Sequence, residues 1–251
     1  MAKPTIPLRL LGGLSLDDPC GEMASSLPNR RAEAVLAILA VCGEMGCSRD
    51  RLAGYLWPES TEAHARHNLR DALYAIRNAL GRDAVLSAGE TVRLNSSVVR
   101  SDVAMFAEAL NDGRSADAVD LYRGPFLDGF HIRASHELEL WVEDQRTRLL
   151  QERQQAVKAL AKKAEREERW DEAAGLWARA VAVDRFNSRL MVRRMVALAR
   201  AGDRANAVIE GEEHCRALKK ELDLEPDLAF LEELHRIRSG KTARPQFFTP
   251  P

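Results

Sequence analysis

The sequence predicts a mainly α fold in two domains, a small mixed domain followed by a longer all-helical one. Three observations lead to this prediction. Short strand patterns, three helical patterns and a closing hairpin follow one another within the first 100 residues. The segment 60–81 combines an apolar helical stripe with a basic face. Two later segments align at an offset of 34 residues, the tetratricopeptide period.

Composition favours a folded protein without a membrane segment. The chain has 251 residues, of which 45% are hydrophobic, enough for a core in each of two domains. Its longest strongly apolar run, 34–42, is too short to span a bilayer, and no signal-peptide pattern is found. The four cysteines form no C-x-x-C pair, so we expect reduced thiols, no zinc site and a cytoplasmic location.

The formal net charge of -1 conceals a difference between two parts of the chain, +1 for residues 1–100 and -2 for the remainder. Residues 1–100 contain 12 Lys and Arg against 11 Asp and Glu, and the remainder contains 25 against 27. A binding mode driven by overall charge is therefore excluded, and only a local basic patch could attract a polyanion.

The first domain is expected to begin with a small sheet. Residues 7–16 suggest two short strands around a Gly12-Gly13 turn, and residues 30–44 form an apolar helix. Ser48 is a suitable N-cap for a short helix that Pro58 ends.

The next helix, 60–81, is the most informative segment. Ser60 or Thr61 caps it, and Gly81 ends it. Its apolar stripe consists of Ala65, Leu69, Leu73, Ile76 and Leu80. Off that stripe lie His64, Arg66, His67, Asn68, Arg70, Tyr74 and Arg77, with the acids Glu62 and Asp71 nearby. Such side chains reach phosphates and base edges, although a solvated basic face is the simpler interpretation.

A β-hairpin follows, with strands at 85–87 and 91–94. Helix, short helix, longer helix and hairpin together predict a winged helix-turn-helix domain covering 1–100. The hairpin would be the wing, placing Arg93 or Thr91 near a nucleic-acid backbone.

The second domain, 101–239, is expected to contain only helices. A helix at 113–122 is followed by a Gly- and Pro-containing break at 123–130 and a long charged helix at 134–168. We expect the last helix to begin at Pro226 and the tail, 240–251, to be disordered.

Within this domain, two segments repeat. Their alignment pairs Ala173 with Ala207, Trp177 with Gly211, and Ala180 with His214. Small residues at these positions allow paired helices to approach closely, which predicts a tetratricopeptide-like stack.

No motif indicates an enzyme, a cofactor or a metal. Residues 239–242 read SGKT, but a phosphate-binding loop needs a glycine where His235 stands. His64 and His67 could share a metal ion, yet no third ligand is placed to complete the site.

Several motifs, taken in order, resemble a known family. They are SRDRLAGYLWPE, ARHNLRDALYAIRNALG, SDVAMFAEAL, LYRGPFLDGF, ELELWVEDQRTRLL and ELDLEPDLAFLEEL. The chain resembles the Streptomyces antibiotic regulatory protein type of activator, which joins a response-regulator-like winged helix to a bacterial transcriptional activator domain. The resemblance implies sequence-specific binding to double-stranded promoter DNA, often at direct repeats, recruitment of RNA polymerase, and homodimerisation.

The resemblance also implies roles for individual residues. The proposed base readers are Asn68, Arg70, Asp71 and Tyr74. The proposed phosphate contacts are Arg66, His67 and Arg77, with His64 beside them and Arg93 on the wing. Family helices often carry more basic residues at the positions of Asp71 and Ala75.

Three alternatives stay open. The chain could be a protein-interaction scaffold built on its helical repeats, or the N-terminal regulatory part of a larger signalling protein. The helical domain could also bind a small effector, although no residue set indicates a ligand.

Overall fold

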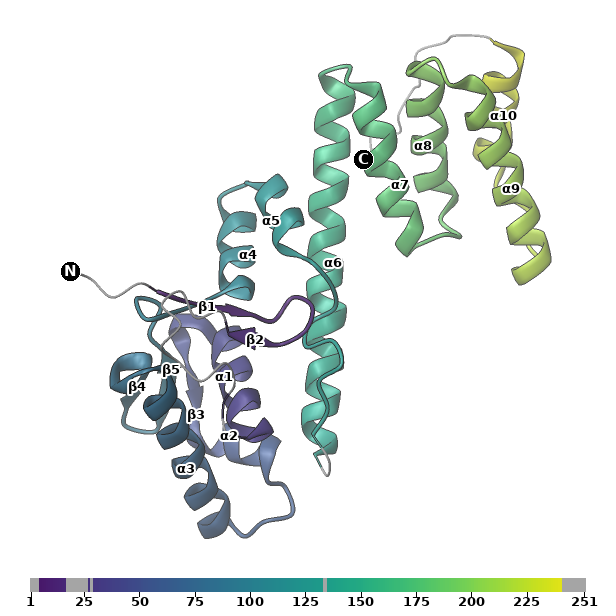
Figure 1. Cartoon of the computed structure of the whole chain (residues 1–251). Helices are drawn as coiled ribbons and strands as arrows, with labels where there is room; N and C mark the ends of the chain where they lie inside the picture. The colour runs from purple at the N-terminus through teal and green to yellow at the C-terminus, as the bar shows by residue number, and fades with distance from the viewer. Residues whose placement is uncertain (1–4, 17–26, 28, 133–134, 241–251) are drawn as a thin grey trace. The chain divides into compact units, whose positions relative to one another are not determined.

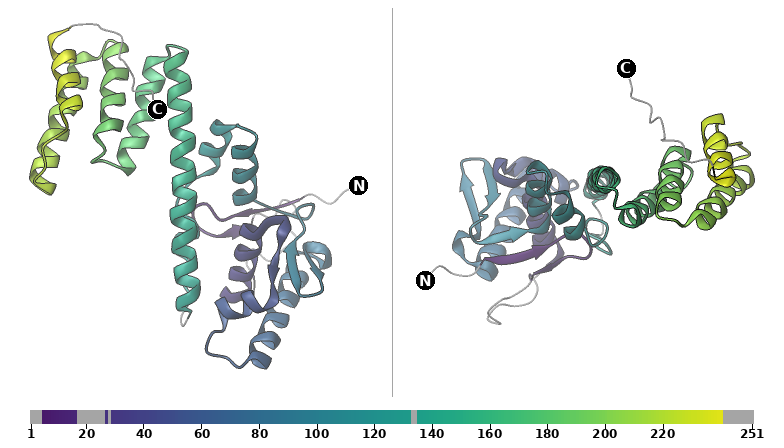
Figure 2. Two further views of the ribbon diagram at one scale, coloured as in Figure 1. Left: turned by 180° about the vertical axis from the view of Figure 1, so that it is seen from behind. Right: turned by 90° about the horizontal axis from the view of Figure 1, so that it is seen from above.

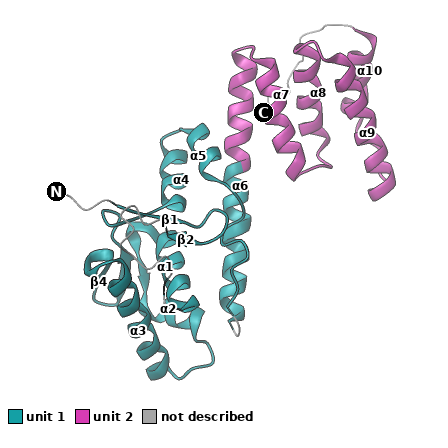
Figure 3. Ribbon diagram, viewed as in Figure 1, with its two compact units in different colours: residues 1–153 teal, residues 154–251 magenta. Residues whose placement is uncertain are grey.

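A computed structural model describes residues 5–16, 27, 29–132 and 135–240. The chain divides into two compact units, 1–153 and 154–251, which Figure 3 colours separately. Unit 1 therefore extends well past residue 100. The boundary predicted at residue 100 was placed between the expected DNA-binding domain and the expected activator domain, and it stays a prediction.

Unit 1 contains two small three-stranded sheets. The strands are β1 (Ile6–Arg9), β2 (Ser15–Leu16), β3 (Cys47–Ser48), β4 (Val85–Ala88), β5 (Thr91–Leu94) and β6 (Val99–Ser101). Their orders are β2-β1-β6 and β3-β5-β4. Both predicted hairpins are present, β1 with β2 and β4 with β5. The third strand of the first sheet, β6, was not predicted, and it pairs in parallel with β1.

The helices of unit 1 follow the predicted order. They are α1 (Arg30–Cys42), α2 (Arg49–Leu56), α3 (Glu62–Leu80), α4 (Asp102–Asn111), α5 (Ser115–Leu121) and the first part of α6 (His136–Arg166). Ser48 caps α2 as predicted, because its hydroxyl accepts a hydrogen bond from Arg51 N at 3.2 Å. Gly81, at a φ of 102°, ends α3, also as predicted.

One core joins the winged helix to the helices that follow it in unit 1. Phe106 of α4 and Leu36 of α1 are both completely buried in it. The Asp102 carboxylate accepts hydrogen bonds from Leu10 N at 2.9 Å and Leu11 N at 3.0 Å. This contact attaches the N-terminal strand segment to the start of α4.

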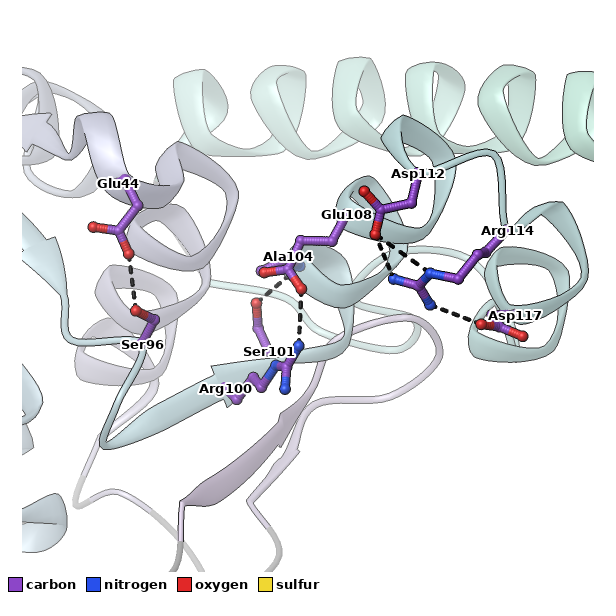
Figure 4. A network of polar contacts seen from close by, with 9 residues as sticks. All are labelled: Glu44, Ser96, Arg100, Ser101, Ala104, Glu108, Asp112, Arg114 and Asp117. Carbon is purple, nitrogen blue, oxygen red and sulfur yellow. Dashed lines mark hydrogen bonds and ion pairs between the residues drawn. The ribbon is translucent and has the colours of Figure 1, made fainter.

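Several polar contacts lie between the loop that follows β5 and helix α5 (Figure 4). Arg100 of β6 pairs with Glu108 of α4 at 2.8 Å. Arg114 pairs with Asp112 at 2.9 Å and Asp117 at 2.7 Å, which joins the ends of α4 and α5.

Unit 2 is a stack of antiparallel helices. Its members are the rest of α6, α7 (Trp170–Val183), α8 (Ser188–Arg200), α9 (Arg204–Leu222) and α10 (Leu228–Ser239). Figures 1 and 2 show α7, α8 and α9 side by side in chain order, and α10 contacts both α8 and α9.

The buried positions of α7 and α9 confirm the predicted repeat. Ala173 and Ala207 are both fully buried, and Trp177 is 2% exposed. Gly211 takes the place of Trp177 in the second repeat, and a Cβ there would lie 2.5 Å from Met195 Sδ. The small residue therefore permits close packing of α9, as the sequence indicated.

The predicted start of the last helix is wrong by two residues. Helix α10 begins at Leu228 and not at Pro226, because Asp227 is its N-cap and accepts a hydrogen bond from Phe230 N at 2.8 Å. The tail predicted to be disordered lies, from residue 241, outside the described residues. Among the described helices, none combines the length and the hydrophobicity that a transmembrane segment needs.

Candidate nucleic-acid interface

Helix α3 and the β4–β5 hairpin form the surface that the sequence predicts to contact DNA. One side of α3 is core, and the residues there are at most 5% exposed: Ala65, Leu69, Ala72, Leu73, Ile76 and Leu80. The opposite side is open to solvent and is called here the exposed α3 face. It consists of His64, Arg66, His67, Arg70, Asp71, Tyr74 and Asn78. Because α3 contacts α1 and α2, the orientation of this face is fixed by packing.

The middle of the exposed α3 face carries Arg70 and Tyr74. Tyr74 is 65% exposed, although burying an aromatic ring is normally favourable. Among the described residues, no hydrogen bond or ion pair engages Arg70. Both side chains are therefore available to a partner. Asn78, four residues after Tyr74, is exposed beside them and was not predicted, although the helical period could have indicated it.

Ion pairs surround the N-terminal part of this face. Arg66 Nη2 lies 3.1 Å from Asp50 of α2 and 3.0 Å from Glu62. His67 Nε2 lies 3.5 Å from Asp71. Because all these side chains are about half exposed or more, water and salt screen the pairs and they contribute little to stability. An incoming phosphate could replace the carboxylates at small cost.

Arg77 lies at the other end of α3 and contacts the wing. Its Nε and Nη2 both donate to the carbonyl oxygen of Val85 at 3.2 Å, and Nη2 donates to Ser87 Oγ at 2.9 Å. Arg49 of α2 also donates to Ser87 Oγ, at 3.2 Å. Strand β4 is thus held by arginines from both helices of the helix-turn-helix.

The predicted wing residue Arg93 is also engaged within the protein. It forms an ion pair with Glu44, in the short helical turn Gly43–Met45 after α1. Glu44 accepts a second hydrogen bond from Ser96 Oγ at 2.9 Å (Figure 4). Glu44 therefore anchors the second strand of the wing and the loop that follows it.

Asn68 does not share the exposed α3 face. It is half-buried and lines a shallow depression together with Trp57, Arg31 and His131. The structure thus brings together most of the predicted residues but sets Asn68 to one side. Its predicted role in base reading stays a prediction.

The described residues offer no arrangement for metal chemistry. No group of three or more His, Cys, Asp or Glu side chains among them is placed to hold a metal ion. Thr61 Oγ1 lies 2.8 Å from His64 Nδ1, so this histidine contributes to the start of α3.

A comparison with protein families identifies the second half of the chain. The model described as the bacterial transcriptional activator domain matches residues 94–238. The chain belongs to the bacterial transcriptional activator domain family. The predicted resemblance to regulators of the Streptomyces antibiotic regulatory protein type is thereby confirmed.

A solved structure shares the fold of nearly the whole chain. It is described as Mycobacterium tuberculosis EmbR in complex with a low affinity phosphopeptide. The TM-score is 0.70 at 20% sequence identity, and the match covers 96% of this chain and 67% of that one. The similarity confirms the mainly α fold, a winged helix followed by helical repeats. A search of curated proteins found no match.

The bacterial transcriptional activator domain match begins at the end of the wing. Its first residue, Leu94, is the last residue of β5. The exposed α3 face precedes the match. The family assignment thus concerns the helical part, and the role of the α3 face must be argued from its own residues.

Proposed function

We propose that this protein is a sequence-specific DNA-binding transcriptional activator. The observation that carries the proposal is the exposed α3 face, on which Arg70 and Tyr74 point away from the core without an internal partner. Arg forms paired hydrogen bonds with guanine in the major groove, where an α-helix fits. Membership in a transcriptional activator family agrees with this use.

Different arginines have different roles in this proposal. Arg70 reads a base, with Tyr74 and Asp71 beside it. Arg66 exchanges its contacts with Asp50 and Glu62 for a DNA phosphate. Arg77 and Arg93 act through the wing, because their bonds to Val85 and Glu44 set its position before any DNA is bound.

A binding titration tests the DNA part. The probes are fluorescent duplexes from the region upstream of the protein's own gene and a random duplex of equal length. We expect Arg70→Ala to weaken specific binding by about 1–3 kcal/mol, or roughly 5- to 150-fold, with little effect on the random duplex. Arg66→Ala should weaken binding to both duplexes and reduce the salt slope by about one.

A matched control is Arg216→Ala in α9. The side chain of Arg216 is 74% exposed. Its replacement should leave the affinities for the specific and the random duplex unchanged. If the operator lies outside the region upstream of the gene, selection of bound sequences from a randomised duplex pool should identify it. Equal affinity for all duplexes at every salt concentration, together with no enriched sequence, would overturn the proposal.

Recruitment of RNA polymerase is proposed for unit 2. Four leucines near the junction of α9 and α10 are more than 40% exposed: Leu222, Leu224, Leu228 and Leu231. An exposed apolar cluster favours a protein partner. In a reconstituted transcription reaction, Leu228→Asp should abolish activation and preserve DNA binding, whereas Leu140→Asp in unit 1 should preserve both. Full activation by Leu228→Asp would show that these leucines do not form the contact with RNA polymerase.

A scaffold without DNA binding is the second candidate, and the same leucine cluster favours it. It predicts binding to a protein partner together with equal, weak affinity for all duplexes. The Arg70 titration therefore separates the two functions.

A further inference from the structure

A groove in unit 1 lies between the end of the wing and helix α4. Its walls come from the C-terminal end of α1 with the turn after it, the segment 94–101, α4 and the middle of α6. The groove has a volume of about 260 Å³. Figure 4 shows part of its rim, with Glu44, Ser96, Arg100 and Glu108. Because the lining residues come from separate parts of the chain, no local pattern in the sequence indicated this groove.

The deepest residues of the groove are apolar. Leu39 of α1, Val99 of β6 and Leu149 of α6 line it, although each is at most 2% exposed. Ala104 and Ala107 form the adjoining side of α4, where their short side chains leave the groove open. Covering this surface with an apolar molecule would release water from it, which is favourable.

The charged side chains at the rim are already paired within the protein. Arg100 Nη2 lies 2.8 Å from a carboxylate oxygen of Glu108. Arg148 Nη1 lies 2.8 Å from Glu152, and Glu44 is engaged by the wing. Two arginines and two glutamates line the groove, so their formal charges cancel. A charged molecule would have to break one of these pairs or stay without a counter-charge, whereas an uncharged molecule would not.

One polar side chain in the lining is available to a ligand. Asn111, at the end of α4, is exposed, and its amide makes no hydrogen bond with another described residue. Ser101 Oγ, in contrast, already accepts a hydrogen bond from Ala104 N at 3.1 Å (Figure 4). A side-chain amide can both donate and accept. Asn111 could therefore orient a molecule that carries one hydrogen-bonding group.

We propose that this groove binds a small uncharged molecule with an apolar body and one hydrogen-bonding group. A dry cavity of about 150 Å³ holds benzene, so by proportion the groove admits about ten non-hydrogen atoms. A bicyclic ring of the size of indole meets these requirements. The lining includes Glu44, which anchors the wing, and Leu94, where the activator domain match begins. The occupant would thus contact both functional parts of the chain, and its binding does not require DNA.

Titration of the full-length protein with indole, followed by methyl NMR, tests the proposal. We expect saturable shifts at the methyl groups of Leu39, Val99 and Leu149, with a dissociation constant below about 1 mM, and none at Leu228 in unit 2. Indole-3-acetate and tryptamine carry related rings with a negative and a positive charge, and each should bind at least about tenfold more weakly. Equal binding of the three compounds, saturation without shifts at the groove, or no saturation up to the solubility of indole would overturn the proposal.

Two tryptophan variants test the location of the site. Ala107 on α4 and Ala116 on α5 are both exposed, and only Ala107 lines the groove. Ala107→Trp should fill the groove and weaken indole binding at least about tenfold, whereas Ala116→Trp should bind indole as wild type does. Asn111→Ala should weaken indole binding about 2- to 10-fold, because a hydrogen bond is lost. Unchanged affinity in Ala107→Trp would overturn the assignment to this groove, and the wild-type methyl shifts do not depend on the folding of any variant.

Discussion

The guanidinium of Arg77, in the last turn of α3, donates two hydrogen bonds to the carbonyl oxygen of Val85 on β4. Helix and wing are thus joined by a partly buried polar contact between two residues that lie eight apart in the sequence. An arginine that sequence inspection assigns to DNA has a structural partner inside the protein.

Replacing Arg77 by alanine should therefore change stability before it changes DNA affinity. Loss of its bonds to Val85 and Ser87 is expected to lower the free energy of unfolding by about 1–2 kcal/mol. Urea denaturation measures this loss, and Arg82→Ala, an exposed arginine five residues on, serves as the control. Unchanged stability with a salt slope reduced by one would instead identify Arg77 as a phosphate contact.

Gly46 should be difficult to replace. An alanine Cβ at this position would lie 2.7 Å from Val92 O and 2.8 Å from Thr91 Cγ2, at a φ of 68°. We expect Gly46→Ala to destabilise the protein by about 1–3 kcal/mol, because backbone must move to relieve the contact. Gly54→Ala in α2 meets nothing within 4 Å and should stabilise it by roughly 0.5–1 kcal/mol. Thermal melting of the two variants should give shifts of opposite sign.

Gly211 provides the equivalent test in unit 2. A Cβ there would meet Met195 Sδ at 2.5 Å and Leu234 Cδ1 at 2.7 Å. Since Met195 is fully buried, Gly211→Ala should lower stability by about 1–3 kcal/mol. The control is Gly175→Ala in α7, which has open space around it. If both variants melt at the same temperature, the stability of unit 2 does not depend on the close approach of α9 to α8 and α10 at Gly211.

His214 should make the stability of unit 2 depend on pH. It is 3% exposed, lies 3.0 Å from Ser188 Oγ and has its ring centroid 5.1 Å from that of Phe230. Burial lowers its pKa below 6.5 in the folded state. Below pH 6.5 the unfolded chain thus binds a proton that the folded chain does not, and stability falls as pH decreases toward the folded-state pKa.

Denaturation of wild type and His214→Gln from about pH 7.5 to about pH 5.5 measures this difference. The variant should lose less stability than wild type over this range, whereas His64→Gln on the exposed α3 face should follow wild type. Parallel pH profiles for all three proteins would contradict the assignment.

Local signals in the sequence predicted much of unit 1 correctly. Ser48 and Gly81 mark helix ends because caps depend on a few neighbouring residues. Strand β6 was missed because its partner, Ile6, lies more than 90 residues away from Val99, and three residues carry no clear alternation. Pairing of that kind is fixed by tertiary structure and not by local pattern.

The candidate site was predicted only as far as helical periodicity extends. The period separates the core side of α3 from its exposed side, and the burial of Leu69 and Leu73 confirms it. It cannot show that Arg77 and Arg93 bind Val85 and Glu44, because those partners lie on other elements. A basic residue on a helix face can therefore be assigned to DNA only when the structure shows that it has no partner within the protein.

The parallel pairing of β1 with β6 has a consequence for synthesis on the ribosome. Ile6 emerges early, but its partner Val99 and the carboxylate of Asp102, which binds Leu10 and Leu11, are translated about 90 residues later. The first strand must wait in the nascent chain while the helix-turn-helix is already complete. A nascent chain from which the wing has emerged, but not β6, would thus hold α3 without a complete N-terminal sheet, and protease digestion of stalled chains would detect the late protection of residues 6–11.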